Sequence, residues 1–379
     1  MRISILTFCG LVLALSAHAF EPTWLPGGEE TKKAVAARKG QSELSKLALS
    51  MQPGTWAELK TEVPPGTWSS PKVNGGRNGG GSGGLHIAGW TDDAHWDSRT
   101  GQFFFMGLRQ TRRFIAYSEE KNAWRTVELD PKSDNPCFRS KFGHIYSSNG
   151  FDHERSRFYH RYNGFESETE GLKLEGGISF FDALTEKWTK LPAKPEGQGG
   201  SMSIEYFNAM DGLISLGKTP CIFSQARQKW EPLGTSPVDG YHSLFRHNPY
   251  RKEVLMTGGN NNRRVVARFK ADGTIEQLKE APLDLGVRGD KITIDPATGR
   301  YLIFGFRDEA GAQCFEFDSD KNEYVAIASA ISQWPFKSSA MPVCAFIPEY
   351  GVSMWADGKV YLYKHAPAAA GVQAQTVSK

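Results

Sequence analysis

One pattern of strand, turn and strand recurs six times along the chain, and this repetition constrains the fold more than any other feature. In each unit a short apolar strand leads into a polar turn, and a second, more hydrophobic strand ends on glycine or at a polar loop. The residues that mark the six turns are Asp97, His153, Asn208, Asn248, Asp295 and Pro348. Their successive separations of 56, 55, 40, 47 and 53 residues are typical of propeller blades.

A second half follows the hairpin in most units. It contains a third strand, a charged turn and a closing strand that opens on an aromatic residue, with turns at 118–124, 182–188, 225–230 and 318–324. Four antiparallel strands make one blade, so the predicted fold is an all-β, six-bladed β-propeller. The alternative is seven blades, which requires residues 68–88 to fold as more than a loop.

The last unit lacks a closing strand, and the missing strand is predicted at the other end of the chain. Residues 54–59, Gly-Thr-Trp-Ala-Glu-Leu, are similar to the closing strand at 187–191 but precede every complete unit. Pairing 54–59 with the final unit closes the ring and removes two exposed sheet edges. The predicted propeller therefore spans residues 54–365.

The repeat resembles that of kelch and galactose-oxidase-like propellers. The resemblance rests on the tryptophans that open closing strands and on Gly258-Gly259 at a strand end, and it covers roughly residues 54–365. It implies the fold and leaves the function open.

The N-terminus has the pattern of an export signal. Met1-Arg2 precedes an apolar run and a small-x-small site at Ala17-His18-Ala19, which predicts a signal peptide over 1–19 that is cleaved near Ala19. The mature protein is then secreted or periplasmic. Residues 20–53 are interpreted as a leader, either a short helix that covers the ring or a flexible segment, and 366–379 as a flexible tail.

The sequence indicates no cofactor and no metal site. Cys137, Cys221, Cys314 and Cys344 are widely spaced, and we interpret them as buried thiols rather than a disulfide framework. Galactose-oxidase-like copper chemistry is not expected, because a radical-copper site needs a ligand from a domain after the propeller. A phosphate loop is not expected at 74–84 either, because this glycine-rich run lacks Gly-Lys-Ser/Thr.

Charge is distributed unevenly although the formal net charge is only +3. In a propeller, the loops entering first strands and the loops joining second to third strands emerge on one face. These loops carry many basic residues, whereas the turns of the other face carry acidic residues such as Glu119, Asp182 and Asp318. A cationic mouth on one face favours an anionic ligand.

For an exported protein the expected partner is an acidic polysaccharide; nucleic acid and membrane insertion are not expected. Arginine suits carboxylate and sulfate because its planar fork donates two parallel hydrogen bonds. The candidate substrate-binding residues are Arg109, Arg139, Tyr146, Arg263, Arg307 and Lys337.

The second unit holds the densest set of reactive side chains, in the segments Asn149-Gly150-Phe151-Asp152-His153 and Phe158-Tyr159-His160-Arg161-Tyr162. These segments resemble secreted propeller polysaccharide lyases of the ulvan-lyase kind. The resemblance implies β-elimination, in which an arginine neutralises the uronate carboxylate, a base removes the C5 proton and an acid protonates the leaving oxygen.

The catalytic candidates divide by role. They are His144 or His242 as base, Tyr162 or Tyr241 as acid, and Arg161 with Arg288 as the carboxylate clamp. Histidine suits the first role because it titrates near neutral pH. Two alternatives stay open: such histidines and tyrosines can instead bridge blades by hydrogen bonds, and the protein can be a non-catalytic kelch-like module that binds glycan or protein.

Overall fold

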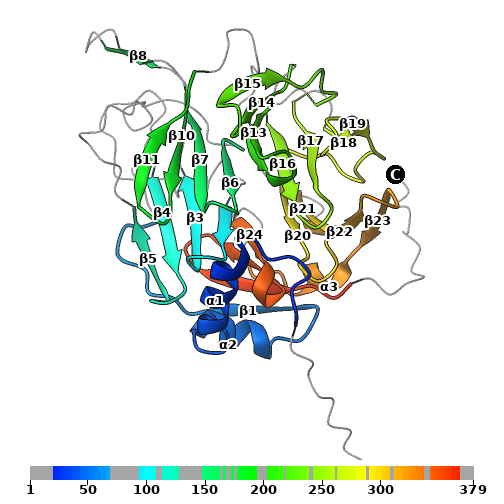
Figure 1. The fold of residues 1–379 in the computed structure, drawn as a ribbon. Helices are drawn as coiled ribbons and strands as arrows, with labels where there is room; N and C mark the ends of the chain where they lie inside the picture. The colour runs from blue at the N-terminus through cyan, green and yellow to red at the C-terminus, as the bar shows by residue number, and fades with distance from the viewer. Residues whose placement is uncertain are drawn as a thin grey trace, which may run out of the picture.

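The computed structural model confirms the predicted β-propeller: its described residues form six four-stranded antiparallel sheets arranged as a ring of blades (Figure 1). The structure describes residues 20–68, 94–107, 113–127, 147–162, 165–167, 172–174, 177–193, 203–216, 219–238, 242–260, 263–286, 290–307, 311–336 and 342–367. The alternative of a seventh blade rests largely on residues 69–88, which lie outside the described residues.

The first three blades follow the chain in order. Blade 1 contains β2 (Ala94–Asp97), β3 (Gln102–Gly107), β4 (Arg113–Ser118) and β5 (Ala123–Thr126). Blade 2 contains β6 (Asn149–Asp152), β7 (Arg157–Tyr162), β10 (Gly177–Asp182) and β11 (Lys187–Lys190), with the hairpin β8 (Phe165–Ser167) and β9 (Leu172–Leu174) between β7 and β10. Blade 3 contains β12 (Ile204–Phe207), β13 (Gly212–Ser215), β14 (Cys221–Ser224) and β15 (Lys229–Pro232).

The last three blades complete the ring. Blade 4 contains β16 (Ser243–Asn248), β17 (Glu253–Gly258), β18 (Val266–Lys270) and β19 (Ile275–Gln277). Blade 5 contains β20 (Asp290–Ile294), β21 (Tyr301–Arg307), β22 (Gly311–Asp318) and β23 (Glu323–Ala326), followed by α3 (Ala328–Ser332). Blade 6 contains β24 (Val343–Ile347), β25 (Val352–Ala356), β26 (Val360–Lys364) and β1 (Thr55–Leu59).

The ring is closed by the N-terminal strand, as the sequence predicted. Thr55 of β1 pairs with Lys364 of β26, and Leu59 pairs with Val360 in antiparallel register. First strands of successive blades contact one another around the centre, and β24 of blade 6 contacts β2 of blade 1. Closure leaves β26 with a partner on both sides, so it presents no open edge.

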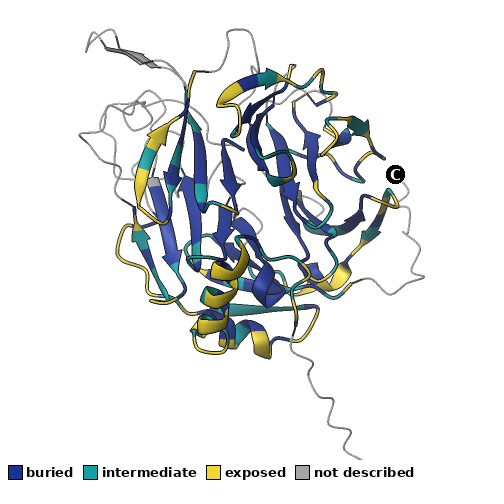
Figure 2. Cartoon of the chain, in the orientation of Figure 1, coloured by how far each residue is buried: buried dark blue, intermediate teal, exposed yellow. Residues whose placement is uncertain are grey.

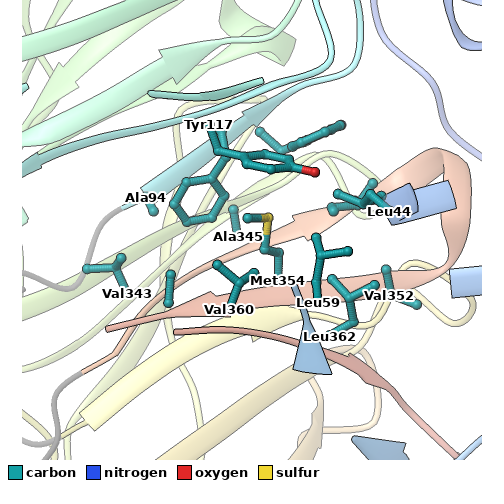
Figure 3. Close-up of a cluster of buried hydrophobic side chains, with 14 of the residues drawn as sticks. Leu44, Leu59, Ala94, Tyr117, Val343, Ala345, Val352, Met354, Val360 and Leu362 are labelled. Carbon is teal, nitrogen blue, oxygen red and sulfur yellow. The ribbon is translucent and has the colours of Figure 1, made fainter. Parts of the chain in front are cut away.

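Side chains between neighbouring blades form the core, and the strands nearest the centre are almost wholly buried (Figure 2). Between blades 6 and 1, aliphatic residues of β24 to β26 pack against β2 and the Tyr117 ring (Figure 3). Leu44 of the N-terminal segment and Leu59 of β1 join the same cluster. Cys221, Cys314 and Cys344 are buried thiols, as predicted, and Cys137 lies outside the described residues.

Residues 20–53 contain two helices, α1 (Gly28–Arg38) and α2 (Glu43–Ser50), which lie beside β1 and blade 6 (Figure 1). Ser42 caps α2 by accepting a hydrogen bond from the Ser45 N–H, at 3.0 Å. Arg38 anchors α1 to blade 1, because its guanidinium donates to Glu119 Oε2 at 2.8 Å and to the Ser98 carbonyl at 2.5 Å. The segment therefore packs against the ring through both polar and apolar contacts.

Candidate functional site

The ring has two chemically distinct faces. We call the face where first strands begin and second strands end the loop face, and the opposite one, with the turns between first and second strands, the turn face. Seven predicted site residues lie outside the described residues: Arg109, Arg139, His144, Tyr146, Tyr241, Arg288 and Lys337. Tyr162 and Arg307 are in described strands, but their side chains are not described. Arg161, His242 and Arg263 are described, and all three are at the loop face.

Trp24 contacts three blades near the centre of the turn face. The Trp24 ring lies 5.4 Å from His153, 5.7 Å from Tyr250 and 6.2 Å from Phe346, measured between ring centroids. These three residues belong to blades 2, 4 and 6, which are every second blade of the ring. The indole therefore lies near the ring axis at the turn face. The sequence singled out neither Trp24 nor this contact.

Carboxylates of the turn face are partly neutralised within the protein. Glu119 is fully buried and pairs with Arg38, Glu186 pairs with Arg125, and Asp318 lies 2.9 Å from the Arg251 guanidinium. His95 and His153 are buried, and the His153 ring contacts Trp24. The turn face therefore does not present a uniform acidic field.

Arg161 is the most informative residue of the loop face. It occupies β7, and its N–H donates to the Ser148 carbonyl at 2.8 Å. It lies two residues beyond Tyr159, whose ring stacks on Tyr206 of blade 3, so the Arg161 side chain also faces blade 3. Its Nη1 is buried without a hydrogen-bond partner among the described residues.

No carboxylate of the described residues compensates the charge of Arg161. Burial lowers the pKa of its guanidinium to about 10, and the Cys221 thiol acts in the opposite direction. The group therefore stays protonated at neutral pH in a poorly solvated place. An unpaired buried charge is costly, and an anion from outside the chain would relieve that cost.

A serine frame holds the loop-face ends of blades 2, 3 and 4 together. Ser147 Oγ donates to the Ser243 carbonyl at 2.5 Å, and the hydroxyls of Ser203 and Ser243 are 3.4 Å apart. The Ile204 N–H donates to the Ser147 carbonyl at 2.8 Å. Ser243 directly follows His242 in the chain, so the frame is adjacent to that residue.

His242 lies directly before β16 at the loop face and is partly exposed. Its Nδ1 is 2.5 Å from Oδ1 of Asn260, which follows β17 of the same blade. Its backbone has a positive φ of 64°, which is uncommon for a residue with a side chain. Arg263 lies between β17 and β18 of the same blade and is exposed. The structure thus brings one buried cation, one imidazole and one exposed cation to a single face.

Two searches of the described residues bear on other classes of site. They contain no group of three His, Cys, Asp or Glu side chains arranged to hold a metal ion. Among the same residues, no helix is both long and apolar enough to span a membrane.

The fold defines a six-bladed β-propeller with a candidate anion site at its loop face. No family model and no curated protein matches the chain. Thus the kelch and galactose-oxidase resemblance is supported only as far as the propeller fold.

Solved structures share that fold at low sequence identity. A structural genomics protein of unknown function from Bacteroides thetaiotaomicron has a TM-score of 0.51 and 12% identity, over 82% of this chain and 75% of the other. An auxiliary nutrient binding protein from Bacteroides ovatus has a TM-score of 0.50 and 9% identity, over 81% and 75%. An oligogalacturonate lyase in complex with manganese has a TM-score of 0.44 and 10% identity, over 73% and 77%.

Proposed function

We propose that the protein binds an acidic, uronate-containing polysaccharide at its loop face and cleaves it by β-elimination. The buried guanidinium of Arg161, which has no anionic partner among the described residues, is the observation that carries this proposal. A uronate carboxylate would supply the missing charge and would match the planar donors of arginine. Export after signal-peptide cleavage near Ala19 is part of the proposal, because it places the protein where such polysaccharides occur.

The proposed reaction assigns one step to each group. Arg161 pairs with the carboxylate of the uronate, which makes the neighbouring C5 proton more acidic. The imidazole of His242 accepts that proton, the C4–O bond breaks, and the electron pair of the C5–H bond forms the C4–C5 double bond. A tyrosine hydroxyl, Tyr162 or Tyr241, protonates the leaving oxygen.

The products are a new saccharide end and an unsaturated uronate, which absorbs ultraviolet light. Purified mature protein is incubated with a panel of uronate-containing and sulfated polysaccharides while this absorbance is followed. We expect a rise with at least one uronate polymer, at least a hundredfold slower in Arg161→Met and in His242→Ala. Arg157→Met is the matched control, because Arg157 is on the same strand but pairs with Asp182 at the turn face.

Two negative outcomes have different meanings. If absorbance stays constant but the protein is retarded in a gel that contains one polymer, and Arg161→Met abolishes the retardation, the protein is a non-catalytic glycan-binding module. If neither absorbance nor mobility changes with any uronate polymer, the proposed function is wrong.

A further inference from the structure

We propose that Asn260 is a positioning residue that keeps the imidazole proton of His242 on Nδ1 and so makes Nε2 the basic nitrogen. This inference rests on the proposed function, in which His242 is the base. The hydrogen bond between His242 and Asn260 is a built feature of the loop face, because separate backbone constraints place each of its two residues.

The donor and acceptor roles follow from the atoms involved. Nδ1 of His242 is 2.5 Å from Oδ1 of Asn260, and an amide oxygen can only accept a hydrogen bond. The hydrogen therefore belongs to Nδ1. A neutral imidazole carries one hydrogen, so its basic lone pair is on Nε2. The Asn260 oxygen thus favours the neutral tautomer that has a basic Nε2.

Asn260 is placed by the double glycine that ends β17. Gly258 pairs with Ser243 across β16 and β17, so the residues that follow Gly258 lie next to the residue that precedes Ser243, which is His242. Gly258 has a φ of 74°, and a Cβ there would be only 2.7 Å from the Leu285 carbonyl oxygen. Only glycine fits this turn, and the turn sets the position of Asn260.

His242 is held from the other side by the serine frame. Its neighbour Ser243 accepts a hydrogen bond from Ser147 of blade 2 and lies 3.4 Å from the Ser203 hydroxyl of blade 3. The backbone of His242 itself has a positive φ of 64°. Strained backbone conformations of this kind persist where surrounding structure enforces them, and they are concentrated at functional sites.

The test reads the tautomer directly and needs no substrate. Full-length mature protein is labelled with 15N in its histidine rings, and the His242 signals are assigned by their loss in His242→Gln. Spectra are recorded above neutral pH. We expect the proton on Nδ1 in the wild type and in Asn260→Asp, which keeps an acceptor oxygen. In Asn260→Leu, which has a similar volume but no acceptor, we expect a mixture of tautomers.

Kinetics then separate positioning from binding. With a polymer that the wild type cleaves, we expect Asn260→Leu to lower kcat about tenfold or more and to change KM less than about twofold, as for a base in the wrong tautomer. Asn260→Asp should retain most of kcat. A wild-type proton on Nε2, or a tautomer that is unchanged in Asn260→Leu, would overturn the inference. If the tautomers behave as expected but no polymer is cleaved, the proposed function fails while the role of Asn260 in fixing the tautomer stands.

Discussion

Trp24 meets His153 edge to face, with ring centroids 5.4 Å apart and ring planes at 88°. The contact joins the N-terminal segment to a buried imidazole that lies 6.4 Å from the ring of His247. Burial and the nearby Arg246 charge lower the pKa of His153 to about 3, so the imidazole is neutral at physiological pH. The N-terminal segment therefore packs against a neutral imidazole, and protonation of His153 would weaken this packing.

Replacing Trp24 by alanine tests how much its indole stabilises the protein. The indole is only partly buried but contacts three rings, so Trp24→Ala should lower the free energy of unfolding by about 2 kcal/mol. Urea unfolding measures this loss, and trypsin should cut after Lys32 or Lys33 of α1 faster than in the wild type. Trp24→Phe, which keeps an aromatic ring, should show a smaller change in both. Equal stability of Trp24→Ala and wild type would mean that the segment docks without the indole.

Stability should fall on acidification because of His153. Its pKa is about 6.5 in the unfolded chain and about 3 in the folded protein, so between these values only the unfolded state takes up the proton. Stability then rises with pH, and His153 alone costs about 2 kcal/mol between pH 7.5 and pH 5. Burial lowers the pKa of His95 and His247 in the same direction.

Other buried groups change the stability with pH in the opposite direction. The effect of His153 is therefore measured as the difference in stability between the wild type and a His153 variant. Burial raises the pKa of Glu349 to about 7, and this carboxyl therefore favours the folded state as pH falls toward 4.5. Urea unfolding of wild type and His153→Phe at pH 7.5, 6 and 5 isolates the histidine. The variant should lose about 2 kcal/mol less than the wild type between pH 7.5 and pH 5. Parallel losses would show that His153 is not held neutral.

Arg38 should be the most sensitive position of the N-terminal helices. Its guanidinium bonds to Glu119, which is fully buried, and lies 3.6 Å from buried Glu349. Arg38→Met leaves both carboxylates without their cation and should lower the free energy of unfolding by about 3–5 kcal/mol. Lys32→Met on the same helix removes an exposed pair with Glu29 and should cost less than about 0.5 kcal/mol. Urea unfolding that gave similar losses for both variants would contradict the assigned role of Arg38.

The fold was largely predictable from the sequence because its signal is local and repeated. Alternating strands and polar turns recur at a blade period, and the unpaired strand at 54–59 indicated how the ring closes through Lys364 and Thr55. The position of Trp24 was not predictable in this way. Trp24 stands alone in a short polar segment, and its three partners come from three different blades. Only the closed ring brings them together.

The sequence predicted which types of residue the candidate site contains, but it did not predict how they are arranged. Arg161 was chosen for its position in the second unit, but its lack of a carboxylate partner among the described residues depends on blade 3, which no local pattern describes. Asn260 was overlooked, although Gly258-Gly259 before it is a readable signal for a constrained turn. Glu119 was assigned to an acidic face, whereas the structure buries it against Arg38. Pairing between distant segments decided each of these outcomes.

Gly150 shows how closely first strands approach one another. A Cβ at this position would be 3.0 Å from the Tyr206 nitrogen and 3.1 Å from the Glu205 Cα, both backbone atoms of blade 3. Gly150→Ala should therefore push blades 2 and 3 apart and lower the free energy of unfolding by about 1–3 kcal/mol. Gly286→Ala is the matched control, because the nearest atom to its Cβ would be 3.7 Å away. Thermal or urea unfolding that ranked the two variants equally would contradict this close approach.

The variant Arg161→Met should affect binding of the acidic polymer without lowering the stability of the protein. Because the Arg161 guanidinium is buried without a counter-charge among the described residues, Arg161→Met removes a desolvation cost and fills the same space with apolar atoms. We expect the free energy of unfolding to stay unchanged or to rise by about 1 kcal/mol, while binding of the acidic polymer is lost. Arg157→Met on the same strand removes a cation from the Phe180 ring, 4.6 Å away, and should cost about 1 kcal/mol without affecting binding.

The sign of the Arg161 effect decides between two explanations of that residue. If urea unfolding shows Arg161→Met to be less stable than the wild type by more than about 1 kcal/mol, the guanidinium contributes to folding, as paired buried charges do. The argument for an anion site would then lose its basis. If the variant is as stable as the wild type but no longer binds, the charge is retained for a ligand. Stability at pH 7 must be measured without polymer, because a bound anion would itself stabilise the wild type.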